Sequence, residues 1–252
     1  MKKHFILFTV SFALLSCNEN ELPKAYQLDK LRILAIHADS PELADSALPA
    51  SVNITTYVSD TNGDGRVLQF TAAACPDPGV AYGAEPTCDG NPLKVDLAVP
   101  DVTATSQAAN SGIFGLPNLT GAIPAFSVAV PTGLLTGRSA IDQYNGVAYL
   151  VTIKVRGGGE SARSFKRIFV STKPTQNSNP TISDIKSNGA SLATLPSGEV
   201  ELTSTIGTAE TYTVKSADGD DSRTERLYTS WYVNKGELKS SITLDGEESK
   251  WT

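Results

Sequence analysis

The chain has two histidines, His4 and His37, and His4 lies within an N-terminal segment that resembles an export signal. His37 follows a strand-like run at residues 31–36, and the chain contains no Gly-x-Ser-x-Gly motif. Serine and cysteine hydrolases need a base beside their nucleophile. The sequence therefore predicts no catalytic residue, and we interpret His37 as a structural residue at a strand end. Carboxylate-pair chemistry stays open, because acids distant in sequence can meet in space.

Residues 60–65 carry oxygen ligands at alternate positions, Asp60, Asn62 and Asp64, followed by glycine. This spacing resembles the first half of a calcium-binding loop. The twelfth position of such a loop would be Thr71 rather than a glutamate, and Asp, Asn and Gly also form ordinary β-turns. Two interpretations remain, a turn or a calcium site, and calcium is the one candidate cofactor; none is required.

Three cysteines occur, Cys17, Cys75 and Cys88. If Cys17 is acylated, as argued next, an even pair remains in a protein that leaves the reducing cytosol. Such a pair predicts a Cys75–Cys88 disulfide that closes a turn-rich loop. A zinc site is the alternative, but two cysteines without a nearby histidine do not complete its ligands.

The first residues are basic, Lys2 and Lys3, and an apolar run follows at residues 5–15. This run is too short to span a bilayer and matches a secretory signal. Its end, Leu14-Leu15-Ser16-Cys17, resembles the lipobox of bacterial lipoproteins. The resemblance implies a signal peptide at residues 1–16, cleavage before Cys17, and acyl chains (palmitate among them) that bind Cys17 to the lipid bilayer. Asn18 in place of aspartate implies sorting to the outer membrane.

Cleavage before Cys17 removes 16 residues, including two lysines and no acid, so the formal charge changes from −6 to −8. An acidic protein is a poor partner for nucleic acid and for anionic lipid headgroups. The remaining 236 residues are rich in Thr, Ser, Val, Gly and Pro. These residues favour strands and turns, so the sequence predicts an all-β fold.

After a flexible tether at residues 17–30, the segment 31–171 predicts a first Ig-like β-sandwich domain. Its expected strands are residues 31–36, 51–58, 66–74, 93–99, 123–130, 147–156 and 161–171. Gly157, Gly158 and Gly159 predict a hairpin turn between the last two strands. Residues 134–144 predict one short helix.

Residues 172–180 are polar and contain two prolines, which indicates a linker. Strands are expected beyond it at residues 181–185, 200–203, 210–216, 223–233 and 238–244. Five strands fall short of the seven of an Ig-like sandwich of roughly 100 residues. We therefore expect tandem antiparallel Ig-like units, the second, residues 181–252, being incomplete.

Several of these segments together are similar to those of one protein group. Residues 31–42, 60–65 and 74–79, and later 211–214 with Trp231, resemble Ig-like-domain lipoproteins of myxobacteria and related Gram-negative bacteria. The resemblance spans most of the chain after Cys17. It implies an envelope location and β-modules, and it supplies no catalytic residue.

Three functions remain open. The favoured hypothesis is a non-enzymatic, membrane-anchored envelope lipoprotein that binds or scaffolds an unknown protein or glycan ligand through its sandwich. The second is a hydrolase acting on extracellular polysaccharide, or an accessory module of one, which exposed aromatics beside paired carboxylates would favour. The third is a calcium-stabilised adhesion module.

Overall fold

The computed structural model describes residues 24–61, 66–80, 82–103, 124–191 and 198–252. Cys17, the export segment, Asn62 and Asp64 lie outside these ranges. Within them, seventeen strands are accompanied by one short α-helix and one turn of 3-10 helix, η1 (Asp45–Ala47). The predicted all-β sandwich class is confirmed. No helix in the described ranges is both long and apolar enough to cross a membrane.

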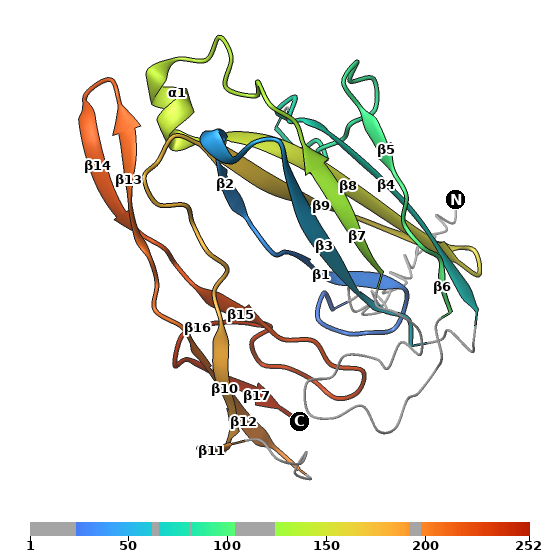
Figure 1. The fold of residues 1–252 in the computed structure, drawn as a ribbon. Helices are drawn as coiled ribbons and strands as arrows, with labels where there is room; N and C mark the ends of the chain where they lie inside the picture. The colour runs from blue at the N-terminus through green and yellow to red at the C-terminus, as the bar shows by residue number, and fades with distance from the viewer. Residues whose placement is uncertain (1–23, 62–65, 81, 104–123, 192–197) are drawn as a thin grey trace, which may run out of the picture.

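The first unit consists of two sheets that face each other (Figure 1). One sheet has the order β1-β3-β7, with β1 (Arg32–Ala38), β3 (Ala50–Ser59) and β7 (Ala125–Val130). The other has the order β2-β9-β8-β4-β5, and β6 also pairs with β4. Its strands are β2 (Glu42–Ala44), β9 (Glu160–Ser171), β8 (Val147–Gly157), β4 (Val67–Pro76), β5 (Val95–Leu97) and β6 (Val102–Thr103). We call it the six-stranded sheet; its pairs are antiparallel except β2 with β9.

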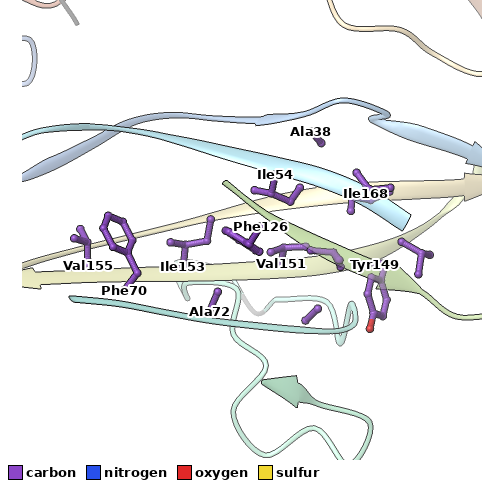
Figure 2. Close-up of a cluster of buried hydrophobic side chains, with 14 of the residues drawn as sticks. Ala38, Ile54, Phe70, Ala72, Phe126, Tyr149, Val151, Ile153, Val155 and Ile168 are labelled. Carbon is purple, nitrogen blue, oxygen red and sulfur yellow. The ribbon is translucent and has the colours of Figure 1, made fainter. Parts of the chain in front are cut away.

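Alternation of side chains along the strands places the core between these two sheets. In β7 every second residue is buried, from Phe126 to Val130, and the residues between them are exposed. Such alternation is what a strand with one buried face requires. Figure 2 shows Ile54 and Phe126 from one sheet pointing toward Val151 and Ile153 from the other. The opposite face of the six-stranded sheet points away from this core.

The predicted hairpin at the glycine triplet is confirmed. Strands β8 and β9 pair without interruption from Val147 opposite Val170 to Gly157 opposite Glu160. The turn residues Gly158 and Gly159 have φ of 54° and 85°, in the left-handed region that glycine adopts without strain. The two strands form the long central part of the six-stranded sheet.

The second unit is built from smaller sheets. The largest has the order β11-β10-β12-β17, and two pairs, β13-β14 and β15-β16, accompany it. Their strands are β10 (Ile182–Ser187), β11 (Ala190–Ser191), β12 (Val200–Ile206), β13 (Thr211–Ser216), β14 (Gly219–Thr224), β15 (Tyr228–Ser230), β16 (Ile242–Leu244) and β17 (Glu248–Trp251). The single strand expected at residues 223–233 is wrong. The chain leaves the β13 pair at Thr224 and joins the β16 pair at Tyr228, so two short strands replace one long strand.

The β13-β14 hairpin extends away from the rest of the second unit and lies beside α1 (Ala140–Asn145) (Figure 1). The helix confirms the predicted helical segment in shorter form. Ser139 caps its first turn by accepting a hydrogen bond from the Asp142 N–H at 3.1 Å. Gly146, with a φ of 99°, ends it. The helix thus belongs to the first unit and contacts β13 of the second unit.

The segment expected as a linker is held against the first unit by Glu42. The buried Glu42 carboxylate accepts hydrogen bonds from the Lys173 ammonium at 3.0 Å and from the Asn177 N–H at 2.9 Å. Asn179 donates to the Ala38 carbonyl at 2.6 Å. Three contacts in one short segment leave it far less freedom than a flexible connection would have.

The described end of the expected tether is also held. The Leu28 N–H donates to the Val233 carbonyl at 2.8 Å, and the Val233 N–H donates to the Tyr26 carbonyl at 3.0 Å. Leu28 and Leu31 are buried. Burial of these two leucines gives an apolar reason for the segment to pack, and residues 24–30 therefore differ from the free tether that their polar composition suggests.

Candidate functional site

A groove of about 540 Å³ lies on the outer face of the six-stranded sheet, away from the core. Its floor comes from β4 and β8, one wall from β9, and the other wall, called the loop wall, from β5 and the loop that precedes it. Ligand sites usually have volumes of about 300 to 1,000 Å³, so the groove is large enough to hold a small ligand. We call it the outer groove.

Small side chains form its floor. Thr71 and Ala73 of β4 lie beside Lys154 and Thr152 of β8 in the ladder. Successive residues of a strand alternate between faces, so these four share the outer face while Ile153 faces the core. The short side chains of Thr71, Ala73 and Thr152 leave a hollow between the taller walls.

The loop wall is fixed by the Cys75–Cys88 disulfide, which confirms the predicted pairing. Both cysteines are buried with Ala73 and Leu150 in a small apolar cluster on the outer face. Asn91 donates a side-chain hydrogen bond to the Pro76 carbonyl at 3.0 Å. These contacts attach the loop to the outer face of the sheet, and the loop carries the wall residues Glu85, Pro86, Thr87 and Asp89.

Three cations lie together at the floor and the β9 wall. Lys154 and Arg163 are directly opposite each other in the β8-β9 ladder, and Arg156 is two residues along β8 on the same face. Among the described residues none of the three has a side-chain hydrogen bond or an ion pair. Partial burial, followed by the charges of Arg156 and Arg163, lowers the pKa of Lys154. We call these residues the cation triad.

A second hollow of about 550 Å³ continues from the outer groove toward the hairpin turn. Its lining includes Lys154 and Arg156, together with the turn glycines and Glu160. Lys154 belongs to both hollows. The cation triad therefore stands where the two hollows meet.

Acidic side chains line the opposite wall. Lys94 lies between Asp89 and Asp96, with its ammonium 3.4 Å and 3.3 Å from their carboxylates. The hydrogen bond to Asp96, and then its charge and that of Asp89, raise the pKa of Lys94. Glu85 lines the same wall without a partner among the described residues. The groove thus carries cations on one side and mostly carboxylates on the other.

One aromatic ring completes the β9 wall. Phe165 is 41% exposed, and the Arg167 guanidinium lies over its ring, 5.1 Å from the centroid. Arg167 is itself fixed by an ion pair with Asp77 at 2.5 Å. A ring held in this way offers a flat apolar surface at the edge of the groove.

The predicted calcium motif lies elsewhere, at the end of β3. The buried Asp60 carboxylate accepts hydrogen bonds from Arg66 at 2.8 Å and 2.5 Å, and Arg66 also pairs with Glu160. These hydrogen bonds and charges raise the pKa of Arg66. Asp60 is thus engaged by a cation of the chain itself. Asn62 and Asp64 lie outside the described residues, so the turn and calcium interpretations of the motif are both untested by the structure.

His37 is exposed on β1, with its Nε2 3.4 Å from the Asn179 amide, and it lines neither hollow. Within the described ranges no group of three or more His, Cys, Asp or Glu residues could hold a metal ion. Cys17 lies outside those ranges. Of the predicted site residues that lie in the described ranges, the structure places only the two disulfide cysteines next to the outer groove.

Sequence reasoning missed the cation triad, although the sequence carried a signal for it. With Gly158 and Gly159 as a two-residue turn, Gly157 pairs with Glu160 and the ladder then pairs Lys154 with Arg163. A like-charge pair facing outward from a predicted hairpin could have been noticed from this register alone.

No family model and no curated protein matches the chain. Among solved structures it is similar to a chimeric titin Z1Z2 functionalized with a KLER exogenous peptide from decorin. The two chains are 10% identical, the match covers 87% of this chain and 81% of that one, and the TM-score is 0.22. A similarity this distant carries no argument.

Proposed function

We propose that this chain is a lipid-anchored protein of the bacterial outer membrane that binds a ligand in the outer groove and catalyses no reaction. The observation that carries the binding role is the groove itself, with three cations beside its floor that have no ion-pair partner among the described residues. Charges of like sign placed side by side destabilise a sheet. A ligand that brings negative charge would offset this repulsion, which gives the arrangement a use.

The anchoring half of the proposal is supported by the sequence alone. Cys17 follows a short apolar run and a small residue, as in a lipobox. Two or more acyl chains give stable attachment to a bilayer, whereas one chain gives reversible attachment. An acylated Cys17 would thus hold the β-units at a membrane surface.

Hydrolysis is a weaker proposal for the same groove. A pair of carboxylates that cleaves a glycosidic bond needs one group free to donate a proton and one to act as base or nucleophile. Asp89 and Asp96 both pair with Lys94, so neither carboxylate is free of a partner. Of the described residues that line the groove, Phe165 alone is aromatic. These features favour binding.

Anchoring is tested by metabolic labelling with a palmitate analogue. The wild-type chain is expected to incorporate label and to sediment with membranes, and Cys17→Ser to lose both properties. The matched control is the double variant Cys75→Ser/Cys88→Ser, which removes cysteines but keeps Cys17 and should stay labelled. Unlabelled wild-type protein in the soluble fraction would overturn the anchoring half.

The side of the membrane is tested by protease digestion of intact cells. Digestion without permeabilisation would indicate a surface protein whose groove meets extracellular ligands. Protection until the outer membrane is opened would indicate a groove that faces the periplasm, and surface adhesion would then be excluded.

A further inference from the structure

In the part of the chain that the structure describes, the cation triad differs from nearby cations in having no acidic partner. Arg167 pairs with Asp77, and Arg66 pairs with Asp60 and Glu160. Lys154 and Arg163, by contrast, face each other directly across the ladder, and neither has an acidic partner among the described residues. The protein as a whole has more acids than bases, so unpartnered cations are not explained by a shortage of carboxylates.

The rest of the lining limits the kind of anion that fits. An anion that presents negative charge to both walls of the groove would meet Glu85, Asp89 and Asp96 on the loop wall, and like charges held close together repel. A ligand with an anionic group on one side and hydroxyl groups on the other meets cations on the β9 side and hydrogen-bond acceptors on the loop side. Phe165 adds an apolar surface of the kind that the C–H face of a sugar ring can cover.

We propose that the outer groove binds an acidic saccharide, with a sugar carboxylate on Lys154 and Arg163, sugar hydroxyls on the loop carboxylates, and a ring face against Phe165. This inference rests on the proposed function, namely that the groove binds a ligand, and it names the ligand's chemical class. Arg156 extends the cationic side into the adjoining hollow and would take the carboxylate of the next sugar unit.

The test uses the full mature lipoprotein in detergent and isothermal titration calorimetry. The probes are a defined oligogalacturonate, a neutral galactan oligosaccharide of the same length, and inorganic phosphate. We expect binding of the oligogalacturonate, weakened by added salt because salt screens charges, and no measurable binding of the neutral oligosaccharide. Equal affinity for the neutral probe, no binding of the acidic probe, or displacement of the acidic probe by phosphate at a similar concentration would overturn the proposal.

Two charge variants test the residues. Lys154→Gln and Arg163→Gln should each weaken oligogalacturonate binding about tenfold, the loss expected for one charge-assisted hydrogen bond. The matched control is Arg226→Gln, at an exposed arginine of the second unit with no ion pair among the described residues. The affinity of this variant for oligogalacturonate should stay unchanged.

Removing either groove cation relieves the repulsion across the ladder, so the melting temperature should hold or rise. Weakened binding with an undiminished melting temperature cannot come from unfolding, and unchanged affinity in both variants contradicts the proposal.

The aromatic contact has its own control on the same strand. Phe165→Ala should weaken binding, whereas Phe169→Ala should not, because Phe169 is equally exposed, at 40%, and lies outside the groove lining. Equal effects of the two substitutions would remove Phe165 from the site.

A groove-filling variant separates failure of this inference from failure of the proposed function. Thr152→Trp places a large side chain on the groove floor. If the neutral oligosaccharide binds and Thr152→Trp abolishes that binding, the groove remains a binding site and only the assignment of an acidic saccharide is overturned. If Thr152→Trp leaves oligogalacturonate binding intact, the ligand binds elsewhere, and both the proposed binding role of the groove and the inference about its ligand are overturned.

Discussion

The side-chain amide of Asn145 forms two hydrogen bonds with the backbone of Lys215, donating to its carbonyl and accepting from its N–H, both at 2.8 Å. Asn145 ends α1 in the first unit, and Lys215 lies on β13 in the second. The amide thus contacts the hairpin as a neighbouring strand would. The Lys215 ammonium also lies 4.1 Å from the centre of the Tyr144 ring, a distance at which a cation and an aromatic ring attract.

Asn145→Ala should loosen the β13-β14 hairpin. The substitution removes two hydrogen bonds, each of which contributes about 1 kcal/mol, so the free energy of unfolding should fall by about 1 to 2 kcal/mol. Hydrogen exchange at the Lys215 amide should accelerate, because its acceptor is lost. Both quantities are measurable, the first by urea denaturation and the second by NMR.

Asn234→Ala is the matched control, since Asn234 is exposed and has no side-chain hydrogen bond among the described residues. It should change neither stability nor exchange. Asn145→Asp should lose only the bond to the Lys215 carbonyl, because a carboxylate can still accept from the Lys215 N–H but cannot donate. It should therefore be less destabilised than Asn145→Ala, and its Lys215 amide should exchange more slowly than in that variant. Unchanged exchange at Lys215 in Asn145→Ala would mean that the hairpin is held by other contacts.

Reduction of the Cys75–Cys88 disulfide should destabilise the first unit and impair the outer groove together. Releasing a loop of this length from its cross-link is expected to remove about 3 kcal/mol of stability in the chain-entropy account. The loop carries Glu85, Thr87 and Asp89 of the groove wall, so ligand affinity should fall as well. Urea denaturation with and without reductant measures the stability change.

The double variant Cys75→Ala/Cys88→Ala should match the reduced protein in stability and should not respond to reductant. Wild-type protein whose unfolding midpoint is the same with and without reductant would contradict the prediction.

Seven strands of the first sandwich could be predicted from the sequence because each shows its own signal, whereas the short strands β2 and β6 were missed. Alternation in β7 and the glycine turn between β8 and β9 are local features that set local structure. The disulfide was predictable for a similar reason, because only two cysteines remain once Cys17 is set aside. Strand β17 was missed, since Glu248–Trp251 is short and largely polar and is a strand only because it pairs with β12.

The groove was harder to predict because it depends on segments far apart in the sequence. Its floor joins Thr71 to Lys154 through strand pairing, and its loop wall is held by Cys88 against Leu150. The linker expected at residues 172–180 has the polar, proline-containing composition of a free segment. The segment is nevertheless held by Glu42, which is distant in the sequence. The composition of the segment gives no sign of this contact.

Arg66→Met should strongly destabilise the first unit. The Asp60 side chain is 1% exposed, and both of its oxygens accept hydrogen bonds from Arg66. Removing the cation leaves a buried carboxylate without a counter-charge, which is expected to lower the free energy of unfolding by about 3 kcal/mol. Adding Asp60→Asn to this variant should restore part of the loss, because the uncompensated charge is gone. Chemical denaturation of these two variants and of the single variant Asp60→Asn measures the coupling.

Arg223→Met is the control for an exposed pair. Arg223 and Asp221 are both more than half exposed, and such pairs contribute roughly 0 to 1 kcal/mol. A loss in Arg66→Met no larger than that in Arg223→Met would contradict the role given to Asp60.

The same ion pair bears on calcium. A calcium ion at Asp60 would have to displace Arg66 from both carboxylate oxygens. We therefore expect the melting temperature of the wild-type protein to be the same in EDTA and in millimolar calcium. A rise with calcium would support the calcium-loop interpretation of residues 60–65 and contradict this expectation.

Lys166 should make stability depend on pH in the alkaline range. It lies opposite Val151 in the β8-β9 ladder, on the core-facing side, and has no side-chain hydrogen bond or ion pair among the described residues. Burial lowers its pKa below the ordinary value of 10.5. The charged form is thus disfavoured in the folded state relative to the unfolded state. At neutral pH folding must bury that charge, so Lys166 opposes folding. This penalty declines as the pH rises through the lowered pKa. It is absent above pH 10.5, where the lysine is neutral in both states.

Lys166→Met should therefore be more stable than wild type at neutral pH, by a margin that shrinks toward pH 10.5. Urea denaturation of both proteins across this range measures the margin, and taking the difference cancels titrations that the two share. The control is Lys239→Met, at an exposed lysine, which should show no such margin. If the margin for Lys166→Met were constant with pH, the gain in stability would come from packing rather than from removal of the charge.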